Sequence, residues 1–252
     1  MGTAQRNAML FPGGDYWQRV VRTAPANLIS YWPLWDASGT GVVNLASLRG
    51  MPAAVGIPAA ESSNVTLAQP GIGDGKTAML FNGTSSYVNI YSAELASAFN
   101  GAEGTLLVWT KVTNADVWAD GTVRRLATLS TDGQNHIHLY KLATGELTFV
   151  RRGSNLNRYT STAVHTAVGW LSIGCAWSIA GNYLLIYVNG VSAGSASTCA
   201  GAWVGALAAD TTVIGSAAVA IPERVWGGYS QHVALWNTPL SAAQIAYLSR
   251  VR

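Results

Sequence analysis

Charged residues are scarce in this chain. They make up 11% of the 252 residues, while hydrophobic residues make up 49%; an average soluble protein has about 25% charged residues. Intrinsic disorder requires low hydrophobicity and high charge, so this composition excludes a disordered chain. The net charge of +3 is too small to predict a nucleic-acid partner. We therefore expect a folded domain with a polar but mostly uncharged surface.

Cysteines and long apolar segments are scarce as well. The two cysteines, Cys175 and Cys199, cannot build a disulfide framework, although a single bridge between them stays open. No stretch approaches about 18 uninterrupted apolar residues, so membrane insertion is not expected. The first residues also lack the basic and apolar regions of a secretion signal.

The small number of carboxylates limits the chemistry that the chain can perform. Glycoside hydrolases place two carboxyl groups across a cleft, and acids that share one strand face lie two residues apart. None of the twelve acidic residues has such a neighbour. The closest pair, Asp116 and Asp120, flanks Trp118 in a predicted loop. We therefore predict a protein that is not an enzyme, with a pair of acids converging from distant strands as the remaining hydrolase alternative.

The segment 170–196 defines the fold class. Leu171, Ile173, Cys175 and Trp177 alternate with small or polar residues, which is the period of a β-strand. The run 183–188 alternates in the same way and ends at an Asn-Gly pair, the strongest short signal for a β-hairpin. The sequence thus predicts antiparallel strands. Tyr183 and Tyr187 form an aromatic row on the strand face opposite the predicted core.

Strand candidates recur at short intervals after residue 28, with Gly-containing turns between most of them. We predict an all-β fold: a two-sheet antiparallel sandwich over 28–252, preceded by an N-terminal arm over 1–27. The expected strands are 28–34, 78–81, 87–90, 105–111, 125–130, 136–141, 146–151, 170–178, 183–189, 191–196, 211–214 and 228–236. Short helices are expected at 15–23, with Asp15 as N-cap, at 92–99, and from 242 onward, where Ser241 and Gln244 form a capping box.

Several segments together resemble the laminin-G-like branch of the concanavalin A-like lectin/glucanase superfamily. They are YWPLWDASGT (31–40), GDGKTAMLFNGTSSYVNI (73–90), EGTLLVWTK (103–111), WLSIGCAW (170–177) with LLIYVNG (184–190), and GYSQHVALWNTPLSAAQIAYL (228–248). The resemblance implies a jelly-roll sandwich that binds glycans, proteins or assembly neighbours. The segment DYWQRVVRTAPANLISYWPL (15–34) is similar to the lead-in of this domain in bacteriophage structural proteins.

These resemblances imply a non-enzymatic structural protein on the virion exterior, as capsid decoration or a tail or fibre component. Its partners would be further copies of the chain or capsid and tail proteins, contacted through Tyr16, Trp17 and Arg19 of the arm. The alternative is a carbohydrate-binding module or adhesin, extracellular or on a cell surface, that contacts glycans. A glycoside hydrolase is the third hypothesis.

Candidate contact residues are aromatic, because sugars and protein partners both favour Tyr and Trp. Trp109, Trp170, Trp177 and Trp236 are expected in the core. The candidates for exposed contacts to a ligand or partner are Tyr183, Tyr187, Trp118, Trp203 and Trp226.

The resemblance also makes calcium the plausible cofactor, held by loop carboxylates and carbonyls. Asp36 and Asp74 lie at the matching positions, in Gly-rich loops. The next loop, 44–50, lacks the carboxylate that many family members have there, and turn formation is the alternative role for both Asp residues.

Basic residues and histidines gather in one region of the chain. Six of the fifteen basic residues lie between 124 and 158 (Arg124, Arg125, Lys141, Arg151, Arg152 and Arg158), and we predict a solvated strand face for them. His136 and His138 share a strand face with Tyr140. Two such histidines can bind zinc, but no third ligand is suggested nearby, so a polar outer face is the prediction.

Overall fold

The two sheets of a β-sandwich make up most of the computed structural model, which describes residues 15–46, 60–154, 156–193 and 197–251, with backbone alone at 156–162. Sheet A has the strand order β14 (Val191–Ser192), β13 (Tyr183–Val188), β12 (Leu171–Ser178), β7 (Glu103–Val112), β16 (Gly227–Trp236), β5 (Thr77–Asn82) and β4 (Thr66–Pro70), with β1 (Leu28–Trp32) paired to β16. Sheet B has the order β11 (Leu156–Val164), β10 (Glu146–Arg152), β9 (His136–Lys141), β8 (Arg124–Ser130), β15 (Thr212–Ile214), β6 (Tyr87–Asn89), β3 (Ala60–Ser63) and β2 (Gly41–Val42).

All strand pairs within the described residues are antiparallel, which confirms the predicted sandwich. The β13–β14 turn has the predicted conformation, because Asn189 and Gly190 both have positive φ, at 51° and 80°. Strands β2, β3, β4 and β11 were not predicted, since their sequences are short or mostly polar. No helix in the described ranges has the length and apolar character needed to cross a bilayer.

Within the described residues, three short helices lie outside the two sheets: α2 (Tyr16–Arg22), α3 (Ala93–Ala98) and α4 (Ala242–Leu248). The loops also contain the 3-10 turns η1 (Pro25–Asn27), η3 (Ala115–Ala119) and η4 (Ala209–Thr211). The capping box of α4 is confirmed: the Ser241 hydroxyl accepts from Gln244 N, and the Gln244 side chain accepts from Ser241 N. Asp15 is the N-cap of α2, but its carboxylate accepts from the Trp17 indole rather than from the helix backbone.

The main hydrophobic core lies between the sheets. Ile173 and Trp177 of sheet A and Leu139 and Phe149 of sheet B belong to one buried cluster. Both cysteines are buried free thiols, so the Cys175–Cys199 bridge is not formed. Burial raises the pKa of the Cys175 thiol well above its usual value, which favours the unreactive protonated form.

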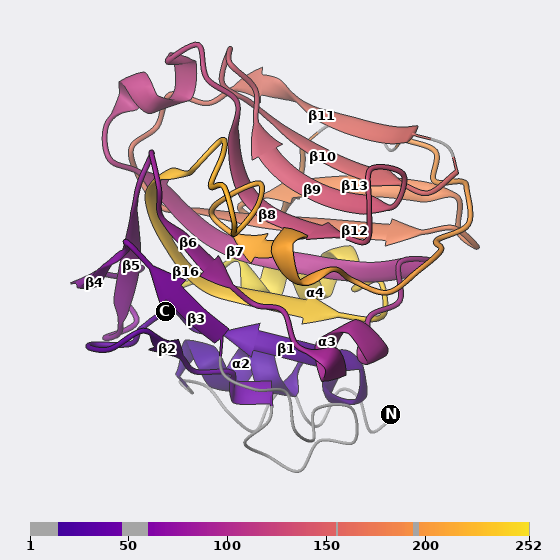
Figure 1. The fold of residues 1–252 in the computed structure, drawn as a ribbon, viewed down its shortest axis with the longest axis horizontal. Helices are drawn as coiled ribbons and strands as arrows, with labels where there is room; N and C mark the ends of the chain where they lie inside the picture. Colours follow the sequence, from indigo (N-terminus) through magenta and orange to yellow (C-terminus); the bar gives the residue numbers. More distant parts are fainter. Residues whose placement is uncertain (1–14, 47–59, 155, 194–196, 252) are drawn as a thin grey trace.

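A second hydrophobic cluster covers the opposite face of sheet A. Leu107 and Tyr187 from the sheet pack there with Tyr16 of α2 and Ile245 of α4. A Cβ on Gly174 would lie only 2.8 Å from Ile245, so glycine lets α4 approach the sheet. Figure 1 shows α2 and β1 together at the lower edge of the sandwich. The central strands β7, β12 and β16 of sheet A are therefore buried on both faces.

The second cluster corrects the prediction for the arm. The Tyr16 hydroxyl donates to Leu248 O (2.8 Å) and accepts from the Trp109 indole (2.7 Å). The Arg19 guanidinium donates to Tyr247 O (3.1 Å) and Arg250 O. Tyr16 and Arg19 are thus buried against the chain's own domain, where they are not available to a partner. Trp17 is half-buried beside them.

Candidate functional site

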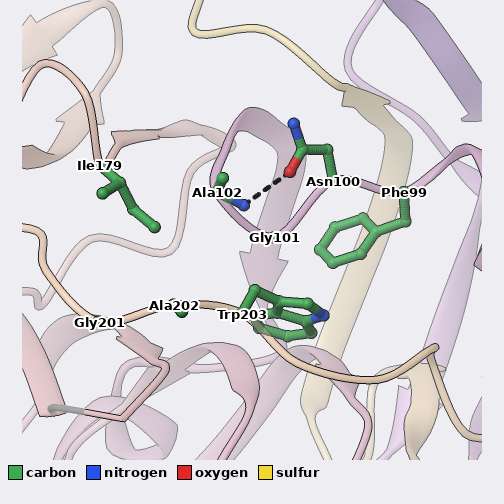
Figure 2. Close-up of a pocket in the computed structure, with 8 residues that line it drawn as sticks. All are labelled: Phe99, Asn100, Gly101, Ala102, Ile179, Gly201, Ala202 and Trp203. Atoms are coloured by element: carbon green, nitrogen blue, oxygen red, sulfur yellow. Dashed lines mark hydrogen bonds between the residues drawn. The ribbon is translucent and has the colours of Figure 1, made fainter.

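A cavity of about 510 Å³ opens at one end of the sandwich, where three loops meet. Its walls are the loop before β7, the turn after β12 and the loop after Cys199. The lining residues are Phe99, Asn100, Gly101, Ala102, Ile179, Gly201, Ala202 and Trp203 (Figure 2). Its volume falls in the usual range for small-ligand sites, about 300–1,000 Å³. Of the five aromatic residues predicted as exposed contacts, it contains Trp203.

Aromatic rings form one wall of the cavity. The Phe99 and Trp203 rings meet edge to face, with centroids 5.3 Å apart and an interplanar angle of 69°. The Trp203 indole also donates to Gly205 O (3.1 Å), which helps to fix its orientation. Both side chains are half-buried. Each therefore packs partly against the protein and leaves part of its aromatic ring exposed to the cavity. Such a wall suits the apolar C–H patches of a sugar ring, because aromatic faces carry partial negative charge.

Gly101 allows the two walls to approach each other. A side-chain carbon at this position would overlap the Trp203 ring. Beside it, the Asn100 carboxamide oxygen accepts from Ala102 N (2.9 Å), drawn in Figure 2, and this contact shapes the loop before β7. Asn100 is exposed at the rim, where its amide NH2 group can donate to a hydroxyl group.

The Arg151 side chain connects two of the loops that form the cavity, the loop before β7 and the loop after Cys199. Its guanidinium is fully buried and donates to Gly101 O (2.7 Å), Ala200 O (2.9 Å) and Gly201 O (2.9 Å). One planar cation therefore holds the loop before β7 and the loop after Cys199 at a set separation, as the fork geometry of arginine permits. Burial lowers the pKa of Arg151 from its usual value.

The predicted solvated face is wrong for three of the six basic residues, while Arg124 and Arg152 are half-buried and the Arg158 side chain lies outside the described residues. Arg125 is 7% exposed, and Lys141 and Arg151 are completely buried. In sequence, Arg151 alternates with Phe149 and Leu147 on the core face of β10, and that spacing was the signal that could have identified it.

None of the described residues that line the cavity has a titratable side chain. Proton transfer in catalysis needs a positioned acid or base, and the described lining residues offer neither.

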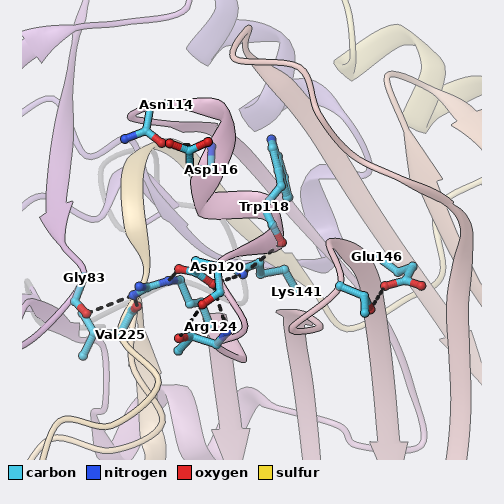
Figure 3. Close-up of polar contacts among 11 residues, drawn as sticks. Gly83, Asn114, Asp116, Trp118, Asp120, Arg124, Lys141, Glu146 and Val225 are labelled. Carbon is cyan, nitrogen blue, oxygen red and sulfur yellow. Dashed lines mark hydrogen bonds and ion pairs between the residues drawn. The ribbon is translucent and has the colours of Figure 1, made fainter.

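The acidic pair singled out from the sequence lies elsewhere, beside η3 (Figure 3). The Asp120 carboxylate accepts from Arg124 Nε (2.7 Å) and Lys141 Nζ (2.5 Å). Burial acts to raise the pKa of Asp120, but the hydrogen bonds from Lys141 and Arg124 outweigh it and lower the pKa. A glycosidase general acid needs a raised pKa, so Asp120 has the opposite character. Asp116 is exposed on η3.

Three of the remaining aromatic candidates are buried, which corrects the prediction of exposed contacts. Trp118 and Trp226 are 1% and 0% exposed, and their rings pack against each other with centroids 6.0 Å apart. Tyr187 is 7% exposed because α4 and α2 cover its face of the sheet. Tyr183 is half-buried on the same strand.

The two proposed calcium ligands make hydrogen bonds within the protein. The Asp36 carboxylate accepts from Val43 N (3.2 Å). The Asp74 carboxylate accepts from Lys76 N (3.1 Å) and Gln231 Nε2 (3.3 Å) and lies 2.8 Å from His232 Nε2. Within the part of the chain that the structure describes, no group of three or more His, Cys, Asp or Glu residues could hold a metal ion. The contact between Asp74 and Lys76 is a local turn, the alternative role considered for Asp74, whereas the Asp36 carboxylate bonds to a backbone amide seven residues away.

Residues 82–246 match the family model described as the concanavalin A-like lectin/glucanases superfamily. The chain belongs to this superfamily. No curated protein sequence matches this lectin-like chain.

Solved structures share the fold of this superfamily member at low sequence identity. The receptor-binding domain of botulinum neurotoxin mosaic serotype C/D has a TM-score of 0.64 at 10% identity, over 89% of this chain and 50% of that chain. Trypanosoma rangeli sialidase in complex with sialic acid scores 0.61 at 15% identity, over 89% and 33%. The CBM40 of Ruminococcus gnavus IT-sialidase, bound to alpha2,3 sialyllactose, scores 0.55 at 14% identity, over 69% and 97%. The lectin-like chain thus spans half or less of the toxin and sialidase chains.

Proposed function

We propose that this protein is a lectin-like domain that binds a glycan in the Phe99–Trp203 cavity and does not hydrolyse it. The observation that carries the proposal is the cavity itself, where an aromatic wall, an exposed amide and loops joined by Arg151 occur together, with no titratable side chain among the described lining residues. A sugar ring would pack its C–H face on Trp203 and exchange hydrogen bonds with Asn100 and the loop backbone.

The structural neighbours support a binding role. One is a carbohydrate-binding module with sialyllactose bound, and others are receptor-binding domains of toxins. Their sequence identity to this chain is low, so they support the class of function and not the particular sugar. The Asp120 carboxylate is paired with two cations, Arg124 and Lys141. This pairing keeps it ionised and unsuited to act as a general acid, which supports the non-enzymatic part of the proposal.

The location on a virion exterior, or otherwise outside a cell, stays a prediction from the sequence. Either location would present the cavity to host or environmental glycans. A role in capsid or tail assembly would need a docking surface other than Tyr16 and Arg19, because both are buried against sheet A and α4. Glycan binding is therefore the better-supported function.

A glycan array tests the proposal with matched variants. The wild-type protein should bind a defined group of glycans, and Trp203→Ala should weaken that binding by at least about tenfold, or about 1.4 kcal/mol. Tyr247→Ala is the control, since Tyr247 is 42% exposed on α4 and does not line the cavity. Absence of binding to any glycan, or equal binding by Trp203→Ala and wild type, would overturn the proposal.

A further inference from the structure

The face of sheet B turned away from the core carries a separate cluster of cationic and aromatic side chains. Cross-strand pairing places Arg125 opposite Tyr140, and His136 opposite Arg152. His138 lies between Tyr140 and His136 on β9, on the same face. Their neighbours Ile137 and Leu139 point the other way, into the core. Three adjacent strands therefore direct these five side chains to one surface.

Among the described residues, Arg125 is a buried cation without an anionic partner. It is 7% exposed, and its guanidinium carbon lies 4.6 Å from the centre of the Tyr140 ring. Its Nε and Nη1 atoms are buried and have no hydrogen-bond partner among the described residues, and the same holds for Arg152 Nε. Arg124 and Arg151, by contrast, donate to carboxylate or carbonyl oxygens. A buried charge without a partner is costly, so the Arg125 guanidinium has unused donors in a place that favours an anion.

The surroundings of Arg125 add positive charge. The Arg125 amide donates to Arg224 O (2.6 Å), which brings the exposed Arg224 beside it. Burial, followed by the charge of Arg224, lowers the pKa of Arg125 to about 10. Asp132 is the acidic residue whose charge acts on this cluster, through His136 at its edge. Uncompensated positive charge therefore gathers around Arg125.

The two histidines form part of the same surface. The His136 and His138 rings are stacked, with centroids 3.9 Å apart and planes within 8°. Burial, then the charges of Arg125 and Arg152, lowers the pKa of His136 to about 4. Burial and the charges of Arg125, His136 and Arg224 lower the pKa of His138 as well. Both rings are thus neutral at pH 7, and each offers one N–H donor.

We propose that this face of β8, β9 and β10 binds the carboxylate or sulfate group of an acidic saccharide, with Arg125 and Arg152 as charged donors and His138 beside them. Arginine suits this role because its planar fork matches two anionic oxygens at once. The anion would compensate the buried charge that the protein leaves unpaired. The inference rests on glycan binding for the nature of the ligand, but the anion site can be tested separately from the Phe99–Trp203 cavity.

Inorganic sulfate is the first probe, with NMR of the histidine ring protons at pH 6 as the readout. We expect a saturable shift of the His136 and His138 signals, because an anion bound by Arg125 and Arg152 changes the electrostatic surroundings of both neutral rings. Arg125→Gln and Arg152→Gln should each weaken binding by about tenfold or more, as expected for a lost charge-assisted hydrogen bond. Lys76→Gln removes the same charge outside this face and should bind sulfate like wild type.

Thermal melting verifies that the variants fold. Arg125→Gln should melt at or above the wild-type temperature without sulfate, since it removes an unpaired buried charge, and it should lose the stabilisation that sulfate gives the wild type. Absence of a saturable histidine shift, or equal sulfate affinity in Arg125→Gln and wild type, would overturn the site.

Saccharides then test the nature of the ligand. Glucuronic acid and galactose 6-sulfate should compete with sulfate for the histidine shifts in wild type, and neutral galactose should not. Sulfate binding without competition from either acidic sugar would overturn the assignment to saccharides. The Trp203→Ala variant should keep its sulfate response, so failure of the cavity and failure of the anion site give different results.

Discussion

The carboxylate of Asp74 lies 2.8 Å from Nε2 of His232, a histidine with no exposed surface whose Nδ1 lies 2.7 Å from the Tyr31 hydroxyl. This chain of three polar groups joins the loop after β4 to β16 and β1. The sequence of contacts, carboxylate to histidine to hydroxyl, is that of a catalytic triad with Tyr31 in the nucleophile position. However, Tyr31 is fully buried, and burial raises the pKa of its hydroxyl well above the usual value. The three groups therefore stabilise the fold.

The Asp74–His232 pair predicts loss of stability in acid. Burial lowers the pKa of His232, and for Asp74 the contacts with His232 outweigh burial, so its pKa is lowered too. A lowered histidine pKa means that stability falls as pH drops below about 6.5, and a lowered aspartate pKa means a further loss below about 4. Urea denaturation from pH 7 to pH 3 should show both losses.

Asp74→Asn removes the group responsible for the second of these losses. It should reduce the free energy of unfolding at pH 7 by about 1–3 kcal/mol, because it weakens a buried charge-assisted hydrogen bond, and it should flatten the dependence on pH below 4. Asp116→Asn is the control, as an exposed residue on η3. An unchanged pH dependence in Asp74→Asn would contradict this role.

Gly101→Ala should abolish ligand binding without changing any side chain that contacts the ligand. The added methyl group overlaps the Trp203 ring, so the ring must move out of the cavity wall. Gly169→Ala is the matched control, because nothing lies within 4 Å of a Cβ at that position. Isothermal titration with an array-selected glycan should show loss of binding in the first variant alone; equal affinity in both would contradict the proposed wall.

Arg151→Met should destabilise the protein by about 3 kcal/mol or more, because three carbonyl oxygens lose their buried donor. Arg224→Met removes an exposed arginine and should change stability by less than about 0.5 kcal/mol. Chemical denaturation measures both values. Similar stabilities for the two variants would mean that Arg151 does not hold the loops.

Tyr16→Phe tests whether α2 belongs to the folded domain. The variant loses the bonds to Leu248 O and the Trp109 indole, which should cost about 1–3 kcal/mol because two buried groups are left unpaired. Hydrogen exchange should show reduced protection at the end of α4. If instead the variant keeps its stability and protection but changes its association state, the predicted partner-docking role would be the better account.

Local sequence patterns predicted the fold well. The hairpin at Asn189–Gly190 and the capping box at Ser241 and Gln244 depend on neighbouring residues, and the structure confirms both. Alternation likewise predicted the core faces of β9 and β12, because an inter-sheet core selects one face of each strand.

Contacts distant in sequence account for the errors at the site. The alternation of the sequence correctly placed Tyr187 on the strand face that points away from the inter-sheet core. It could not show that α2 and α4 cover that face. Trp118 and Trp226 lie 108 residues apart and pack together only after folding. The cavity joins Phe99, Ile179 and Trp203 from three loops, so no local motif identified it.

The most direct test of the account is a two-dimensional NMR titration with an array-selected neutral glycan. We predict saturable shifts of the Trp203 indole N–H and of the Ala102 and Ala202 amides, with little change on β12 or α4. Shifts confined to another surface, with the Trp203 indole signal unchanged, would contradict the proposed binding site.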